Sequence, residues 1–525
     1  MDEEMEKRID QLREIKEKAV LGGGEAKLAQ QREKGKLSAR DRIDRLLDPG
    51  SFVELNLLVG HASGAPGDGV VVGHGTIDGK VVCLYSQDPT VMGGSIGALH
   101  GHKMYTMIET ALDMGVPLIG LHDSPGARTA RISREPRESE PGEARGLSEK
   151  SGSSTFFPNT QASGVVPQIA AILGSCAGIS VYSPALNDFI FMVDGLSHMF
   201  ITGPRIVKSV MGEDLTMEEL GGARIHAQKS GVADFRVKSE DECLQKIKDL
   251  LSYLPSNNRE SPAWKDTGDN PDRLDDGLAD IVPSNPNKAY DMHRIIKSIV
   301  DNGDFLEVKA EFAGEMIVGF TRLDGYPVGI VANQPMVRAG SLTVDSSDKQ
   351  ARFIRFCDCF NIPLVFLVDT PAYQPGSHQE HAGIIRHGAK VLYALCEAVV
   401  PRVNVLLRKC YGGGSLGMGV VPGMCADFNF AWPTFEQSVM GAAQTVDLFY
   451  YQEIAKAENP EQYRQQLINE YQDRFANPFA AVSGATNIQD VIEPRETRRR
   501  LIQAFKLLRA KKITRYPKRH GNIPL

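Results

Sequence analysis

Short apolar runs alternate with longer amphipathic stretches along the chain. Residues 81–85 and 116–121 are continuous apolar runs typical of buried strands. Between them, apolar positions at helical spacing predict a helix that begins at Gly93-Gly94-Ser95, with Ser95 as its N-cap, and ends at Gly115. The order strand, helix, strand, loop, strand, glycine-rich turn, helix predicts an α/β fold of parallel βαβ units with right-handed crossovers.

The same pattern occurs twice. Glycine, proline and aspartate positions of residues 72–125 recur in residues 318–371 at a constant step of 246 residues. Further along, Cys176 recurs as Cys410 at a step of 234, so the first half carries twelve extra residues. We therefore expect two tandem domains related by internal duplication. Two copies of one kind of site are what a reaction between two bulky partners needs.

Changes in composition divide the chain. We expect a first domain over residues 1–255 that opens with a charged helical segment, a polar, proline-containing linker over 256–287, and a second domain over 288–525. The basic tail from Arg495 is interpreted as a solvated helix and an arm that packs on a partner subunit. The extra residues fall in 129–160, a polar stretch read as a mobile surface loop or, alternatively, a lid over the site.

Composition, net charge and the lengths of the apolar runs narrow the class of protein. The 525 residues are 42% hydrophobic and 24% charged with a net charge of −7, which is ordinary for a globular protein and argues against nucleic-acid binding. The lack of an 18-residue apolar run or an N-terminal signal core argues against membrane insertion and favours a cytoplasmic (cytosolic or organelle-matrix) location. The eight scattered cysteines favour buried free thiols, and no metal site is predicted, even for His378 and His381.

The candidate chemistry lies in the backbone, because no GxSxG, HExxH or Walker A motif is present. Two loops in each half follow apolar strands and are rich in small residues, which let a ligand approach the main chain. N–H groups at a helix start favour negative charge, and two that converge form an oxyanion hole. Tight turns that merely pack strand against helix are the alternative. These loops are residues 124–127 and 174–179, and 370–372 and 411–414.

Several longer segments resemble the carboxyltransferase (beta) subunit of biotin-dependent acyl-CoA carboxylases, nearest the propionyl-CoA carboxylase type. The resemblance covers nearly the whole chain, and its most specific segments are residues 35–43, 92–97, 162–168, 181–185, 200–204, 219–222, 383–390, 431–433 and 522–525. It implies two tandem crotonase-like domains, with acyl-CoA on the first and biotin on the second. It also implies a homo-hexamer with active sites between the first domain of one subunit and the second of another.

The same resemblance implies the cofactors, partners and site residues. The chain has no Met-Lys-Met biotinylation motif and no room for an ATP-grasp region, so biotin would arrive on a separate carrier protein, with a biotin carboxylase (alpha) subunit as partner. Gly178 and Ile179, with Ala127 or Gly126, would hold the enolate of a coenzyme A thioester. Gly412 and Gly413, with the Ala372 loop, would hold the ureido oxygen of biotin. Further cofactor-binding residues would be Gly94, Gly126, Arg128, Thr370, Tyr373, Gly414 and Leu416.

Several positions depart from the family pattern. Pro125 replaces a glycine and has no N–H to donate, Ile179 replaces a glycine at the helix start, and Ser415-Leu416 replaces Tyr-Asp beside the acyl pocket. In the second half, Thr370-Pro371-Ala372-Tyr373 stands where Val-Pro-Gly-Phe is usual. We expect an acyl-CoA that is larger or differently charged than propionyl-CoA.

The main interpretation is carboxyl transfer between biotin and the alpha (or vinylogous) carbon of an acyl-CoA. An alternative is the alpha subunit of a biotin-dependent acyl-CoA decarboxylase coupled to a sodium pump, since this chemistry is the same in reverse. A non-catalytic scaffold subunit of such a hexamer is a third hypothesis. A stand-alone crotonase-like hydrolase or isomerase is the fourth, and would need a side-chain acid or base near the loops.

Overall fold

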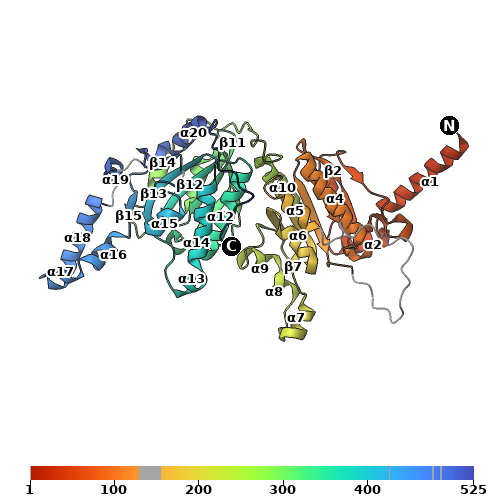
Figure 1. Ribbon diagram of the computed structural model, residues 1–525, viewed down its shortest axis with the longest axis horizontal. Coiled ribbons are helices and arrows are strands. Elements are labelled where there is room, and N and C mark those ends of the chain that lie inside the picture. Colours follow the sequence, from red (N-terminus) through yellow and green to blue (C-terminus); the bar gives the residue numbers. More distant parts are fainter. Residues whose placement is uncertain (1, 129–154, 425, 476–477, 485–486) are drawn as a thin grey trace. The chain divides into compact units, whose positions relative to one another are not determined.

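The computed structural model describes residues 2–128, 155–424, 426–475, 478–484 and 487–525. The chain forms two compact units, Met1–Glu260 and Ser261–Leu525 (Figure 1). Most of the predicted linker, residues 261–287, therefore belongs to the second unit. The predicted loop or lid lies largely outside the described residues, and its last residues, 156–160, belong to a helix (Phe156–Ala162) rather than to a loop.

The first unit is built on one mixed sheet in the strand order β1-β2-β3-β4-β5-β6-β8, with β7 pairing β5. Its strands are β1 (Val53–Leu55), β2 (Val70–Ile77), β3 (Lys80–Gln87), β4 (Leu118–Ser124), β5 (Gln168–Ala177), β6 (Phe189–Val193), β7 (His198–Phe200) and β8 (Phe235–Val237). Its helices are α1 (Glu3–Val20), α2 (Glu25–Glu33), α3 (Ala39–Leu46), α4 (Ala98–Met114), α5 (Phe156–Ala162), α6 (Tyr182–Ala185), α7 (Pro204–Met211), α8 (Met217–Gly221), α9 (Ala223–Gln228) and α10 (Glu240–Tyr253).

The second unit repeats this sheet in the order β9-β10-β11-β12-β13-β14-β16, with β15 pairing β13. Its strands are β9 (Leu306–Val308), β10 (Met316–Leu323), β11 (Tyr326–Asn333), β12 (Leu364–Thr370), β13 (Arg402–Tyr411), β14 (Phe428–Ala431), β15 (Glu436–Ser438) and β16 (Asp490–Val491). Its helices are α11 (Met292–Ile299), α12 (Val344–Cys359), α13 (Ser377–His381), α14 (Ile384–Glu397), α15 (Gly412–Gly417), α16 (Ala442–Phe449), α17 (Tyr451–Lys456), α18 (Pro460–Phe475), α19 (Pro478–Gly484) and α20 (Thr497–Leu508).

The internal duplication is confirmed down to local details. In each half an Asp-Gly turn with positive φ at both residues joins the second and third strands, at Asp78-Gly79 and at Asp324-Gly325. This turn chemistry fixes a tight antiparallel hairpin. The first three strands of each sheet are therefore antiparallel, and only the later strands are parallel. The predicted parallel βαβ units, which begin at the strand over residues 81–85, are confirmed from β3 onward, and the antiparallel strands before β3 lie outside that prediction.

The predicted helix after the third strand begins later than expected. Ser95 follows a short 3₁₀ turn, and α4 begins at Ala98 with Gly97 as its N-cap. The Ser95 side chain instead accepts a hydrogen bond from Arg128. The predicted C-terminus is confirmed, because Gly115 caps α4 in the left-handed conformation.

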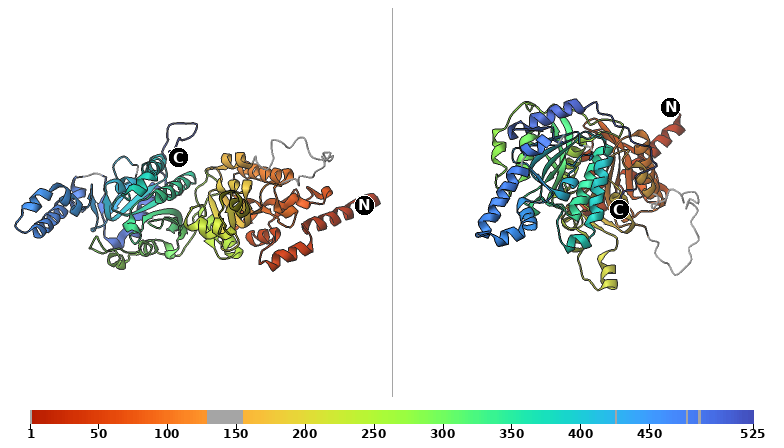
Figure 2. Two further views of the ribbon diagram at one scale, coloured as in Figure 1. Left: turned by 90° about the horizontal axis from the view of Figure 1, so that it is seen from below. Right: turned by 60° about the vertical axis from the view of Figure 1, so that its left-hand side comes forward.

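The helices cover the sheets with apolar faces, as the spacing of their residues requires. In the second unit, α11 buries three isoleucines and α20 buries Leu501 and Ile502 against β10–β14. In Figures 1 and 2, α12 and α14 lie along this sheet, whereas α16, α17 and α18 project away from it. The projecting helices form a small core of their own around Val446 and Ile468.

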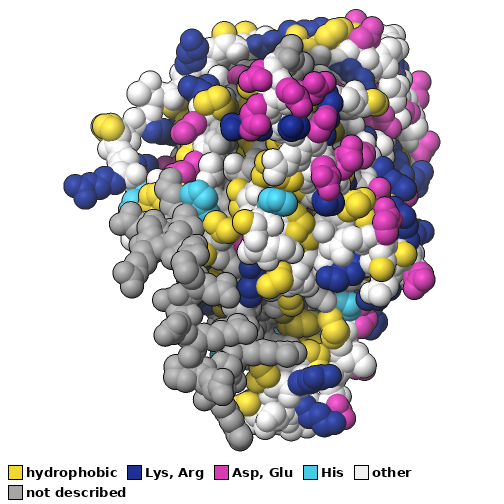
Figure 3. Space-filling model, turned by 90° about the vertical axis from the view of Figure 1, so that its right-hand side faces the viewer, with side chains coloured by type: hydrophobic (Ala, Val, Ile, Leu, Met, Phe, Trp, Pro, Cys, Tyr) yellow, Lys and Arg dark blue, Asp and Glu magenta, His cyan; other side chains and the backbone are white. Residues whose placement is uncertain are grey.

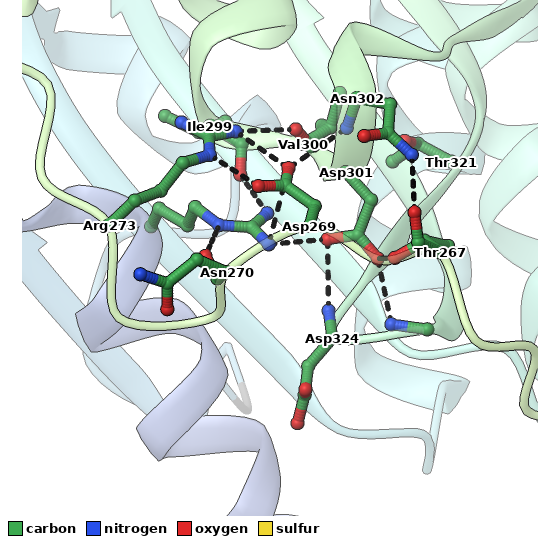
Figure 4. Close-up of polar contacts among 12 residues, drawn as sticks. Thr267, Asp269, Asn270, Arg273, Ile299, Val300, Asp301, Asn302, Thr321 and Asp324 are labelled. Atoms are coloured by element: carbon green, nitrogen blue, oxygen red, sulfur yellow. Dashed lines mark hydrogen bonds and ion pairs between the residues drawn. The ribbon is translucent and has the colours of Figure 1, made fainter.

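The basic C-terminal helix is not solvated on all sides, which corrects the expectation. The Arg498 side chain on α20 is almost fully buried, and its guanidinium lies 2.6 Å from the Asp301 carboxylate and 3.5 Å from that of Asp269 (Figure 4). Asp301 also accepts the backbone N–H groups of Asp324 and Gly325. Arg498 therefore ties the C-terminal helix to a hairpin turn of the sheet.

The tail beyond α20 lies on its own unit rather than only reaching toward a partner. The Lys511 ammonium lies 2.8 Å from the Asp427 carboxylate, and Arg515 donates to the carbonyl groups of Cys396 and Ala398. These contacts anchor the tail along the C-terminal end of α14.

Other bulk expectations can be compared with the structure. Seven of the eight cysteines are described, and all seven are free thiols, five of them buried as predicted. Within the described residues, no helix is long and apolar enough to cross a membrane. On the face drawn in Figure 3, positive and negative side chains are interspersed with hydrophobic ones.

Candidate functional site

In the first unit, the predicted loops follow the neighbouring parallel strands β4 and β5. Gly126 has a φ of 106°, and a Cβ atom there would lie 2.6 Å from the Ala177 carbonyl oxygen and 4.0 Å from the Gly178 Cα atom. The structure therefore brings Gly126 and Gly178 together. Only a residue without a side chain fits at Gly126, because both the space and the backbone conformation exclude one.

Ala127 is held in place by the segment that precedes α4. A parallel bridge pairs Ala127 with Ile96, using the Gly126 carbonyl group and the Arg128 N–H group. The N–H group of Ala127 is thus not part of this bridge. Ala127 is exposed, as the predicted role in binding a ligand requires.

Two further predicted residues of the first unit have structural partners. The Arg128 guanidinium lies 2.7 Å from the Asp68 carboxylate and also donates to the side chain and carbonyl group of Ser95. Gly94 is buried, and a Cβ atom there would lie 2.6 Å from the Asp123 carbonyl oxygen. In the structure Arg128 and Gly94 support the loop that carries Ala127.

In the second unit, the predicted residues also form one cluster. A Cβ atom at Gly414 would lie 2.9 Å from the Thr370 methyl group and 3.2 Å from the Ala372 nitrogen. A Cβ atom at Gly413 would lie 3.2 Å from the Tyr373 ring. Leu416 is 41% exposed on the same short helix, α15, which begins at Gly412.

The duplication relates the two clusters residue by residue. A bridge between Leu342 and Tyr373 matches the bridge between Ile96 and Ala127. Tyr373, rather than Ala372, is therefore the counterpart of Ala127, and Ala372 is the counterpart of Gly126.

Each cluster presents backbone donors at a helix start. The short helix that follows β5 begins at Gly178, and α15 begins at Gly412. The first N–H groups of a helix have no partner within that helix, so those of Ile179 and Gly413 are available to a ligand. Both residues are at least partly exposed. Two such arrangements can stabilise oxygen atoms that carry negative charge.

Of the described side chains at the first cluster, those of His122 and Cys176 could in principle carry protons, and both are buried. His122, next to the end of β4, is buried against the Tyr85 ring, and burial lowers its pKa to about 3. Burial raises the pKa of the Cys176 thiol to about 12. Neither group exchanges protons readily near neutral pH, so the first cluster depends on its backbone.

A buried ion pair beneath each cluster was missed by the sequence analysis. Asp123 lies 2.5 Å from the Lys36 ammonium and 3.2 Å from the Arg42 guanidinium. Asp369, its counterpart, lies 3.0 Å from the Arg408 guanidinium. The 246-residue repeat marked both aspartates, but the cations occupy unrelated positions in the sequence and could not be paired with them.

Comparisons with known proteins agree with this geometry. A family model described as "Carboxyl transferase domain" matches residues 30–523. The chain is 48% identical to the propionyl-CoA carboxylase, carboxyltransferase subunit, of Haloferax mediterranei, over 99% of this chain and 100% of that one. It is 46% identical to the methylmalonyl-CoA decarboxylase subunit alpha of Veillonella parvula, over 99% of each.

Among solved structures, the chain resembles the hexameric transcarboxylase 12S crystallised with methylmalonyl-coenzyme A and methylmalonic acid. The TM-score is 0.91 at 44% identity, covering 99% of this chain and 98% of that one. Two tandem α/β halves with paired strand-end loops define the crotonase-like carboxyltransferases, and the predicted fold class is confirmed. The chain belongs to the carboxyl transferase domain family, and acyl-CoA carboxyl transfer, the predicted class of reaction, is confirmed with it.

Proposed function

We propose that the protein moves a carboxyl group between biotin on a separate carrier protein and the carbon next to the thioester of an acyl-CoA. The observation that supports this most directly is the matched pair of strand-end clusters, at Gly178 and at Gly412. A transfer between two large molecules needs one site for each. The first cluster would take the thioester, and the second the ureido group of biotin.

The first unit would stabilise the enolate of the acyl-CoA through its backbone. The N–H groups of Ile179 and Ala127 would donate to the enolate oxygen, because the Gly126 N–H group already donates to the Ser124 hydroxyl oxygen at 3.2 Å. Removing one such donor typically costs about 3–4 kcal/mol of transition-state stabilisation. Pro125 takes no part, because it has no N–H group.

The second cluster would take the ureido carbonyl group of biotin. Gly413 is exposed, its N–H group has no partner within α15, and the Tyr373 ring lies beside it. Biotin would supply both the carboxyl group and the base that takes the α-proton, so the described part of the first cluster would need no acid or base of its own. The chain's own part is to bind, orient and polarise.

The activity is tested by mixing the purified protein with free biotin and methylmalonyl-CoA or malonyl-CoA. Formation of the decarboxylated acyl-CoA in a biotin-dependent manner supports the proposal, and no reaction with any acyl-CoA would refute it. A Gly413→Phe variant distinguishes a catalytic subunit from a non-catalytic scaffold subunit. Its side chain would press on Tyr373 and abolish turnover in an active subunit, whereas a scaffold would lose nothing.

The direction of the reaction in the cell stays open between two hypotheses. Relatives named as carboxylase subunits and relatives named as decarboxylase subunits match this chain almost equally, at 48% and 46% identity. Copurification with a biotin carboxylase subunit would favour synthesis. Copurification with a membrane subunit of many spans would favour decarboxylation.

We propose that the acyl group is larger or differently charged than propionyl. Leu416 is exposed where the family usually has aspartate, and Ile179 adds apolar surface at the other cluster. Steady-state assays across acyl-CoAs of increasing length test this, and a preference for propionyl-CoA would contradict it.

We also propose that the protein is a homo-hexamer, as transcarboxylase 12S is. Apolar side chains are exposed just after the equivalent strands β7 and β15 and on the helices that follow. Helix α7 buries none of its residues within its own chain. The exposed residues include Ile201, Ile206, Val210, Met211, Val439, Phe449 and Tyr451. Light scattering would give about six times the mass of one chain, and a monomer would contradict the proposal.

A further inference from the structure

The buried aspartates at the ends of β4 and β12 lie where the strand pairing slips. In the first unit His122 pairs with Ile172, and the next pair is Ser124 with Cys176. Between these pairs one residue on β4 thus opposes three on β5. A slip of this kind re-aims the ends of strands and is common beside active sites. Asp123 is the residue at the slip.

The second unit repeats the slip. Val368 pairs with Leu406, and the next pair is Thr370 with Cys410, which leaves Asp369 at the slip. Its carboxylate accepts the N–H group of Lys409, 3.1 Å away, which the irregular pairing would otherwise leave without a partner on β12.

Asp369 also binds the adjacent strand through a side chain. The Arg408 guanidinium donates from Nε at 3.1 Å and lies 3.0 Å away at its second nitrogen, and both side chains are at most 2% exposed. Arg408 in turn donates to the carbonyl groups of residues 283, 285 and 288. The ion pair therefore fixes the end of β12, the end of β13 and a third segment together.

The two loops of the second cluster leave from this point. Ala372 follows Asp369 by three residues, and Gly412 follows Arg408 by four. A change in the spacing of Asp369 and Arg408 would be carried directly into the spacing of the two loops. Oxyanion stabilisation depends on such spacing, since displacements of about 1 Å can cost about 100-fold in rate.

The first unit achieves the same arrangement with other residues. Arg42 contacts Asp123, donates to the Leu173 carbonyl group on β5 at 2.9 Å, and is held by Glu240 of α10 at 2.6 Å. Lys36 adds a second cation to Asp123. Arg42 of α3 thus links the ends of β4 and β5 through an ion pair to one and a hydrogen bond to the other, whereas a direct ion pair links β12 and β13.

We infer that Asp123 and Asp369 are positioning residues that set the distance between the two backbone donors of each cluster. This inference rests on the proposed function and deepens it. Neither carboxylate is placed to touch a substrate, because both are buried by their ion pairs. Their contribution is to the geometry of the loops at 126–127 and 178–179, and at 372–373 and 412–413.

The test compares two equally buried aspartates of the second unit. Asp369 and Asp301 are each almost completely buried, each accepts backbone N–H groups, and each pairs with one arginine. Only Asp369 leads into the proposed site. Asp369→Asn and Asp301→Asn should therefore lower the melting temperature by similar amounts. Carboxyl transfer from methylmalonyl-CoA to free biotin should fall in kcat about 10- to 100-fold for Asp369→Asn alone, with KM for the acyl-CoA unchanged.

A milder variant keeps the test decisive if Asp369→Asn does not fold. Arg408→Lys keeps the positive charge but loses the two-pronged contact with Asp369, and we expect a fall in kcat of about tenfold with a smaller loss of melting temperature than Asp369→Asn causes. Equal kcat values for the Asp369→Asn and Asp301→Asn variants, or an unchanged kcat for Arg408→Lys, would overturn the positioning role alone. A wild-type protein that transfers no carboxyl group would overturn the proposed function, and the positioning role with it.

Discussion

Gly174 and Arg408 occupy equivalent positions on β5 and β13, and each lies against the buried aspartate of its own unit. At the β13 position, the guanidinium of Arg408 itself contacts Asp369. Gly174 has no side chain, so the Asp123 carboxylate lies directly against its backbone, and Lys36 and Arg42 supply the cations. Residues of the N-terminal segment therefore help to hold the first candidate site in place. Both halves have a buried aspartate paired with a cation at the end of the same strand, but the cations come from different parts of the chain.

We expect Gly174→Ala to be strongly destabilising although glycine to alanine is usually mild. The new Cβ atom would collide with the Asp123 carboxylate and lie 2.7 Å from the Lys36 ammonium, deep in a packed region. Overpacking of this kind costs about 1–3 kcal/mol or more. Thermal unfolding measures the effect, and Gly203→Ala is the control, because its Cβ would make only an ordinary contact at 3.5 Å with Phe200. Equal melting temperatures of the two variants would contradict the prediction.

The fold could be predicted from the sequence because its signals are local and repeated, and the same signals led to the candidate loops, whose role stays a prediction. Alternating apolar runs and the 246-residue step indicated the tandem α/β halves, and small residues at strand ends indicated the loops. The start of α4 was misplaced because Gly93-Gly94-Ser95 forms a 3₁₀ turn, so the helix begins only at Ala98. The ion pairs could not be predicted, because Lys36 and Asp123 are 87 residues apart and their contact depends on tertiary packing.

Arg498 offers a test of how the C-terminal helix is fixed. Arg498→Met would leave the buried carboxylates of Asp301 and Asp269 with less compensating charge, although Arg273 would still contact Asp269 (Figure 4). Loss of one partner of a buried pair typically costs about 3–5 kcal/mol. Arg500→Ala, two residues along the same helix, removes only a partly exposed pair with Asp490 and should cost less than about 1 kcal/mol. Urea unfolding of both variants measures the difference, and a cost for Arg498→Met as small as that of Arg500→Ala would refute the role.

His293 is expected to make the stability of the second unit depend on pH. A hydrogen bond to Glu307 at 2.9 Å, together with Asp291 at 2.8 Å, raises the pKa of His293, while partial burial opposes this. The other facing group is the neutral amide of Gln334. Because the folded pKa is raised, the stabilisation is complete below the unfolded value of about 6.5 and is lost as the pH rises through the folded value.

The measurement is the difference in melting temperature between the wild type and His293→Gln across that range. The wild type should be the more stable at pH 6, and its advantage should shrink toward pH 8.5. A difference that is constant with pH, or that grows as the pH rises, would show that the charge of His293 contributes nothing.

Leu416 should govern which acyl group is accepted, because it stands in place of the aspartate that the family usually has beside the acyl pocket. Leu416→Asp restores the usual family residue and places a charge where an exposed apolar side chain now lies. Discrimination by a few apolar contacts is typically about 1–3 kcal/mol. We expect the ratio of kcat/KM for a long-chain acyl-CoA to that for propionyl-CoA to fall about tenfold or more. The control is Leu448→Asp, the same substitution at an exposed leucine of α16, which should leave this ratio unchanged. An equal effect of both variants would exclude Leu416 as the residue that determines acyl-group specificity.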